Sequence, residues 1–140
     1  MPEFRAGDEL ETIDKDIDQG RIMKWAELSG DFNRLHVDPE FAGRTRFGGT
    51  IAHGPMSLAF LNELMTRVFG LAWASAGRLI EVRFRAPVRP GERVTVGGRV
   101  RSVREEGGRR VAECEVFVRK PDGEEAVTGL AEAPLEGGGS

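Results

Sequence analysis

The chain is poor in the residues that build disulfides and metal sites. Its 140 residues contain one cysteine and two histidines. A single cysteine excludes an intramolecular disulfide, and the alternating segment VAECEVFV predicts that Cys114 is a small buried strand residue. His36 and His53 lie far from Cys114 in sequence, and no CxxC or HxxxH spacing is present. We therefore expect no metal site.

Long apolar runs and an excess of positive charge are also missing. No apolar stretch is long enough to cross a bilayer, and the charged start MPEFRAGDEL does not fit a signal peptide. We therefore expect a cytoplasmic protein with no membrane partner. The net charge of −3 argues against nucleic acid as a partner. Seventeen of the twenty basic residues are arginine, which reflects either binding of phosphates and carboxylates or a genome-wide preference for arginine.

The length suits one compact domain with a real core. We expect that domain to occupy residues 1–135, followed by a disordered EGGGS tail at 136–140. No internal repeat is visible.

Three segments in the first half have the pattern of helices. Residues 18–28 place apolar side chains near one face, with Asp18 as a cap. Asp38 followed by Pro39 is typical of a helix start and predicts a short helix at 39–44. Residues 55–69 are apolar around most of a helical circumference, which predicts a buried helix.

After Gly77 the apolar period changes to two. Alternation marks residues 80–86, 93–100, 111–118 and 125–133, and would place Ile80, Val82 and Phe84 on one face. Turn residues fill 87–92, 104–109 and 120–123, so we expect three or four strands joined by hairpins. A further strand near 8–17 gives about five strands and one buried helix. This composition favours an α+β fold in which a curved antiparallel sheet wraps around the helix.

Most of the chemical information lies between Ser29 and Met56. The segment SGDFNRLHVDPEFA at 29–42 resembles the hydratase-2 motif of (R)-specific enoyl-CoA hydratases and MaoC-like dehydratases, Gly-Asp-x-Asn-Pro-Leu-His followed by an Asp-Pro helix start. FGGTIAHGPM at 47–56 resembles the second segment of that family, and FRAPVRPGERV at 84–94 resembles its sheet turn. The resemblance spans residues 25–94. It implies a hot-dog fold, a helix wrapped by an antiparallel sheet, and a homodimer or higher homo-oligomer.

The resemblance also implies a reaction: reversible hydration of 2-enoyl-CoA thioesters to (R)-3-hydroxyacyl-CoA, within fatty acid metabolism. Asp31 and His36 match the catalytic pair of the family, with Asp31 activating water and His36 orienting it. The backbone amide of Gly54 would polarise the thioester carbonyl, as unpaired amides at a helix start favour anions. Asn33 would be a scaffold residue, and His53 would have a supporting role. No cofactor is implied, because coenzyme A, or acyl carrier protein, is part of the substrate.

Two positions depart from the family pattern. Arg34 stands where the family usually has proline, which loosens the loop and adds a cation that could contact the substrate. Asn62 stands where some members use an active-site serine, so it is a candidate supporting residue. Arg83 and Arg85 share a predicted strand face, which is ordinarily solvated, and contact with coenzyme A phosphates is the alternative.

Other interpretations remain open. An aspartate after Ser-Gly is ordinarily a turn or cap residue, and an isolated histidine is more often structural than catalytic. The chain could also be a hot-dog acyl-CoA thioesterase, which directs water at the carbonyl carbon, or a non-catalytic acyl-binding module. The Asp-x-Asn-x-x-His spacing favours the hydratase.

Overall fold

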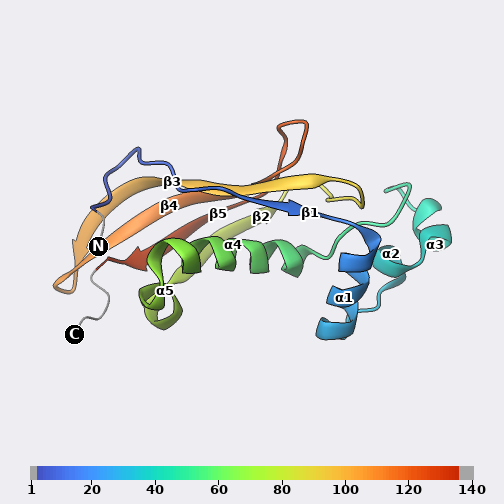
Figure 1. Cartoon of the computed structure of the whole chain (residues 1–140), viewed down its shortest axis with the longest axis horizontal. Coiled ribbons are helices and arrows are strands. Elements are labelled where there is room, and N and C mark those ends of the chain that lie inside the picture. Colours follow the sequence, from blue (N-terminus) through green and yellow to red (C-terminus); the bar gives the residue numbers. More distant parts are fainter. Residues whose placement is uncertain (1–2, 136–140) are drawn as a thin grey trace.

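The structure is a computed structural model that describes residues 3–135 (Figure 1). The expected tail at 136–140 lies outside the described residues. The elements along the chain are β1 (Ile13–Asp16), α1 (Gln19–Ser29), α2 (Arg34–Val37), α3 (Pro39–Gly43), α4 (Gly54–Phe69), α5 (Leu71–Ala76), β2 (Arg78–Phe84), β3 (Arg93–Glu106), β4 (Arg109–Arg119) and β5 (Glu125–Pro134).

The strands form one antiparallel sheet in the order β1-β3-β4-β5-β2. The sheet curves over α4, which lies along one of its faces (Figure 1). The expected α+β architecture and the β3-β4-β5 meander are confirmed. The expected hairpin at 87–92 is wrong, because β4 and β5 separate β2 from β3 and this segment crosses between the two sides of the sheet. Turn residues show where a chain bends, but they do not select the strand that it joins next.

The alternation expected in β2 is broken by a bulge. The register shifts between Ile80 and Arg83, and Glu81 has a positive φ of 52°. Ile80 pairs with Leu130 whereas Phe84 pairs with Val127, an odd separation along β5. Ile80 and Phe84 therefore lie on opposite faces of the sheet, not on one as expected.

Helix α4 is the centre of the core. Seven of its side chains are buried, which confirms the expected buried helix: Met56, Ser57, Phe60, Leu61, Leu64, Met65 and Phe69. The six apolar ones pack with valines of the central strands, among them Val94, Val96, Val116 and Val118. Cys114 is buried there as predicted, and burial raises the pKa of its thiol to about 12, so the thiol is unreactive near neutral pH.

Local signals determine where the shorter helices begin. The Asp18 carboxylate accepts a hydrogen bond from Arg21 N at 2.7 Å, and the Asp38 carboxylate accepts one from Phe41 N at 3.1 Å. Both caps were predicted, and they place α1 and α3 on either side of the segment that contains Asp31 and His36. None of the helices between residues 3 and 135 is both long and apolar enough to span a membrane.

Candidate active site

Asp31 lies in a loop whose shape its own side chain maintains. Asp31 Oδ1 accepts a hydrogen bond from Asn33 N at 3.1 Å, and Ser29 Oγ accepts one from Asp31 N at 3.2 Å. Asn33 then caps α2 by accepting from Leu35 N at 2.9 Å. These short polar side chains satisfy backbone groups of the turn. The loop is thereby fixed between two helices. The scaffold role of Asn33 stays a prediction.

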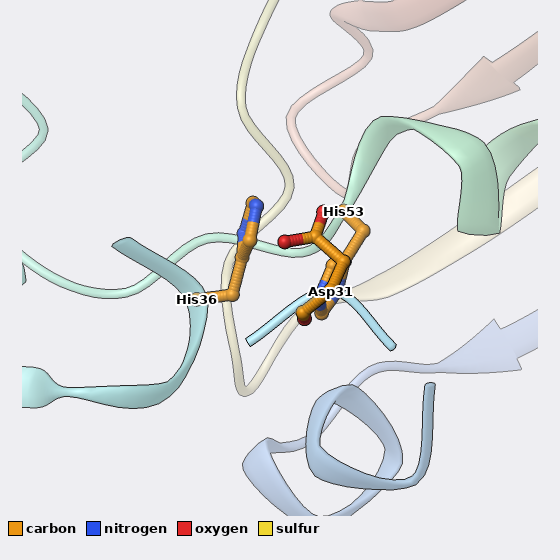
Figure 2. A group of neighbouring side chains, drawn as sticks. All are labelled: Asp31, His36 and His53. Atoms are coloured by element: carbon orange, nitrogen blue, oxygen red, sulfur yellow. The ribbon is translucent and has the colours of Figure 1, made fainter. Parts of the chain in front are cut away.

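His36 in α2 is oriented by a backbone carbonyl. Its Nδ1 lies 2.8 Å from the Ile51 carbonyl oxygen. Because a carbonyl only accepts hydrogen bonds, Nδ1 carries the proton, and in the neutral ring Nε2 keeps the lone pair. Figure 2 shows the Asp31 carboxylate directed toward this imidazole. The arrangement presents an ionisable oxygen and a basic nitrogen to the same space.

His53 immediately precedes α4 and is only 1% exposed. Its Nε2 lies 2.9 Å from the Asp31 carbonyl oxygen, so Nε2 is the donor and Nδ1 has no hydrogen-bond partner within the described residues. The ring stacks on His36 with centroids 3.9 Å apart. Burial lowers the pKa of His53, the bond to Asp31 opposes this, and the neighbouring His36 lowers the pKa further. His53 is therefore neutral near pH 7 and anchors the Asp31 loop to the start of α4.

A pocket of about 330 Å³ opens beside these histidines. His36, His53 and Gly54 line it on the helix side, and Phe84 and Val88 line it on the sheet side. A Cβ added at Gly54 would come within 3.0 Å of the Phe84 ring, so glycine leaves room at the mouth of the pocket. Gly54 N–H is the first amide of α4 and has no backbone acceptor among the described residues. It is available to a ligand in the pocket.

Four predicted residues are not among those that line this pocket: Asp31, Asn33, Arg34 and Asn62. The Asp31 carboxylate still lies within 4.8 Å of a ring nitrogen of His36 and one of His53. Arg34 forms an ion pair with Asp38, with Nη2 3.1 Å from Oδ2, and its guanidinium lies 4.5 Å from the centroid of the Phe41 ring. Asn62 is on an exposed part of α4, where its Oδ1 accepts a hydrogen bond from Trp73 Nε1 at 2.8 Å. Neither residue is among those that line the pocket.

The sequence analysis did not identify several residues around Asp31 and His36. Gln19 donates from Nε2 to the His36 carbonyl at 2.8 Å and accepts from the Thr50 hydroxyl at 2.7 Å, which links α1 to both halves of the site. No local pattern reveals such a bridge. Ser57 also lines the pocket, one turn into α4. Helical spacing from Gly54 could have identified it.

The three titratable side chains are poorly arranged to hold a metal ion together. Asp31, His36 and His53 each offer one ligand atom, and these atoms lie within 4.8 Å of one another. The imidazole lone pairs lie in the ring planes, however, and the two rings are stacked at an interplanar angle of 25°. Stacked rings do not direct both nitrogens at one ion, as tetrahedral coordination needs. The absence of a metal stays a prediction.

The chain is similar in sequence to known proteins. The family model for the MaoC like domain matches residues 3–120. The chain is 43% identical over 81 residues to 3-hydroxyacyl-thioester dehydratase Z of Mycobacterium tuberculosis, a match that covers 56% of this chain and about half, 54%, of that protein. It is 31% identical over 126 residues to the (R)-specific enoyl-CoA hydratase of Aeromonas caviae, which covers 88% of this chain and 90% of that protein.

A solved structure extends the likeness to the fold. The (R)-hydratase from A. caviae superposes with a TM-score of 0.76 at 28% identity, covering 96% of this chain and 99% of that one. The fold is thus the hot-dog arrangement that the sequence resemblance implied. This chain belongs to the MaoC-like domain family.

Proposed function

We propose that this chain catalyses the reversible hydration of 2-enoyl-CoA thioesters to (R)-3-hydroxyacyl-CoA. One observation carries the proposal: the Asp31 carboxylate is directed toward an imidazole whose Nε2 is free to accept a proton, beside an available amide at the start of α4. Relatives named as hydratases and dehydratases support it.

Asp31 and His36 activate the water molecule and transfer its proton. Asp31 removes a proton from a water molecule held between its carboxylate and His36 Nε2, and the resulting hydroxide attacks the β-carbon of the enoyl group. The double bond shifts toward the thioester and forms an enolate. The proton taken from water returns to the α-carbon through the same pair, so the elements of water add across the bond.

Gly54 stabilises the charge that develops on the carbonyl oxygen. An enolate oxygen is more negative than the ground-state carbonyl, so an oriented N–H at a helix start lowers the energy of the transition state more than that of the substrate. Pro55 contributes no competing N–H at the next position. His53 keeps the Asp31 loop against this end of α4.

The test uses crotonyl-CoA and the purified full chain. Absorbance of the enoyl thioester and release of free thiol are followed together. Loss of absorbance without thiol supports the hydratase, and chiral analysis of the product then tests the (R) assignment. Release of thiol would instead establish the thioesterase. No change in either signal, with 3-hydroxybutyryl-CoA also left unchanged, would contradict hydration of this thioester and favour the acyl-binding module.

A further inference from the structure

We infer that the Ser57 hydroxyl donates a second hydrogen bond to the thioester carbonyl oxygen, beside the one from Gly54 N–H. This inference rests on the proposed function, since it names a further residue that would contact the same substrate.

Ser57 is a largely buried residue whose hydroxyl has no protein partner and lines the pocket. It is 5% exposed, and the structure gives its side chain no hydrogen-bond partner among residues 3–135. Two other helical hydroxyls bond back to the preceding turn: Thr66 Oγ1 donates to the Asn62 carbonyl at 2.7 Å, and Ser75 Oγ donates to the Ala72 carbonyl at 3.3 Å. Among the described residues, His53 Nδ1 is the one fully buried side-chain nitrogen or oxygen without a partner, so Ser57 Oγ keeps access to the pocket, where an acceptor on a ligand can reach it.

The position of Ser57 fits a carbonyl oxygen bound at the helix start. Ser57 follows Gly54 by three residues, so the two share a helix face about 4.5 Å apart along the axis. Both line the 330 Å³ pocket together with His36. Of the intervening residues, Pro55 has no N–H, and Met56 N donates to the His53 carbonyl at 3.1 Å. Gly54 N–H and the Ser57 hydroxyl are thus donors that this turn leaves open to the pocket, and Ser57 N–H also has no backbone acceptor outside α4 among the described residues.

Packing alone does not account for a serine at this position. The neighbouring buried residues of α4 are Met56, Phe60 and Leu61, and an alanine would fit among them without an unpaired hydroxyl. An enolate oxygen has lone pairs for two donors, and two oriented donors stabilise its charge better than one.

The direct test is the carbonyl stretching frequency of a bound thioester. Butyryl-CoA labelled with ¹³C at the carbonyl has no double bond to hydrate, so it reports polarisation without turnover. We expect the band to fall in frequency when it binds the wild-type chain, and Ser57→Ala to lose a clear part of that shift. Ser75→Ala, which removes a helical hydroxyl outside the pocket, should keep the whole shift.

Kinetics provide the second measurement. Ser57→Ala should lower kcat for crotonyl-CoA by about 10²-fold, as removal of one oxyanion donor does, with little change in melting temperature. A wild-type carbonyl shift and wild-type kcat in Ser57→Ala would overturn the inference. If the wild-type chain does not hydrate crotonyl-CoA but the carbonyl shift still depends on Ser57, the proposed function fails and the hydrogen bond stands.

Discussion

At the residue scale, the two histidines have opposite tautomers and different tasks. Carbonyl oxygens fix both: Ile51 holds the proton of His36 on Nδ1, and Asp31 holds that of His53 on Nε2. The first leaves a basic nitrogen facing the catalytic space, and the second leaves its free nitrogen buried. Only His36 is therefore placed to exchange a proton with water.

The base assignment predicts a large loss in one substitution. Asp31→Asn keeps an oxygen that can accept from Asn33 N, so the loop should hold, but an amide does not remove a proton. We expect kcat for crotonyl-CoA to fall by about 10²- to 10⁴-fold, with thermal unfolding unchanged. Asp122→Asn is the matched control, because Asp122 Oδ1 accepts from Glu124 N at 2.8 Å in a remote turn. Equal activity in the two variants would remove Asp31 from the mechanism.

The lowered pKa of His53 predicts a pH dependence of stability. In the unfolded chain a histidine takes up a proton near pH 6.5, whereas in the fold the pKa of His53 lies below this value, mainly because the ring is buried. The unfolded state then binds more protons, so stability is full above about pH 6.5 and falls as pH drops below it.

His53→Gln should weaken that dependence, because glutamine can reach the Asp31 carbonyl with an N–H but does not titrate. Urea unfolding at pH 7.5 and 5.5 measures the difference. The wild type should lose more free energy of unfolding than the variant over this interval. A steeper loss in the variant would show that His53 is charged in the fold.

At the scale of elements, α4 joins the two ends of the molecule. Its first turn forms one wall of the pocket, while its later turns pack in the core and support α5. Asn62 belongs to that later part through its bond to the Trp73 indole. The family resemblance drew attention to Asn62 by position in the motif, but α4 places it two turns beyond Gly54.

Asn62→Ala should therefore affect stability more than chemistry. We expect the free energy of unfolding to fall by about 0.5–1.5 kcal/mol, the usual contribution of one hydrogen bond. The cost should largely disappear when Trp73→Phe has already removed the indole N–H, as a double-mutant cycle would show. A loss of kcat comparable to that of Asp31→Asn would return Asn62 to the active site.

The sequence predicted the elements that depend on interactions between residues close together in the chain. Caps such as Asp18 and Asp38 act within three residues, so α1 and α3 were found. The bulge in β2 and the crossover at 87–92 depend on β5, which is more than thirty residues away, and both were missed. The bulge matters for the site because it turns Phe84, a residue 57% exposed, toward Gly54.

At the scale of the whole molecule, the arginines fall into those that pair with a carboxylate and those that do not. Most form ion pairs on the surface, including Arg34 with Asp38. Arg46 and Arg85 line the pocket without a carboxylate partner among the described residues: Arg46 lies over the Phe47 ring, and Arg85 Nε donates to Thr128 Oγ1 at 3.1 Å. We propose that both guanidinium groups contact the phosphates of a coenzyme A thioester.

Arg46→Met should raise KM for crotonyl-CoA by about tenfold, the effect of losing a charge-assisted hydrogen bond, and leave KM for crotonyl-N-acetylcysteamine nearly unchanged. Arg44→Met is the control, since Arg44 pairs with Glu40 outside the pocket. Steady-state kinetics with both substrates measure the two changes in KM. An equal rise in KM for crotonyl-N-acetylcysteamine, which has no phosphates, would show that Arg46 shapes the pocket and does not bind the phosphates.

Assembly remains a prediction at this scale. β2 is an edge strand of the sheet, and Phe84 at its end is exposed beside the pocket. A homodimer or higher homo-oligomer would cover such surface, and light scattering on the purified chain tests this. The cytoplasmic location and the absence of nucleic-acid partners also remain predictions.

The sequence by itself determined what local chemistry can encode: the capped helices, the alternating strands, the buried α4, and the residue types that suit addition of water across the double bond of an enoyl thioester. Only the tertiary structure decided which of these residues meet. It brought His53 and Ser57 to the pair from across a gap of more than fifteen residues, and it left Arg34 and Asn62 outside the pocket. The physical reason is that periodicity and capping report neighbours along the chain, whereas a site forms where packing of α4 against the sheet brings distant segments together.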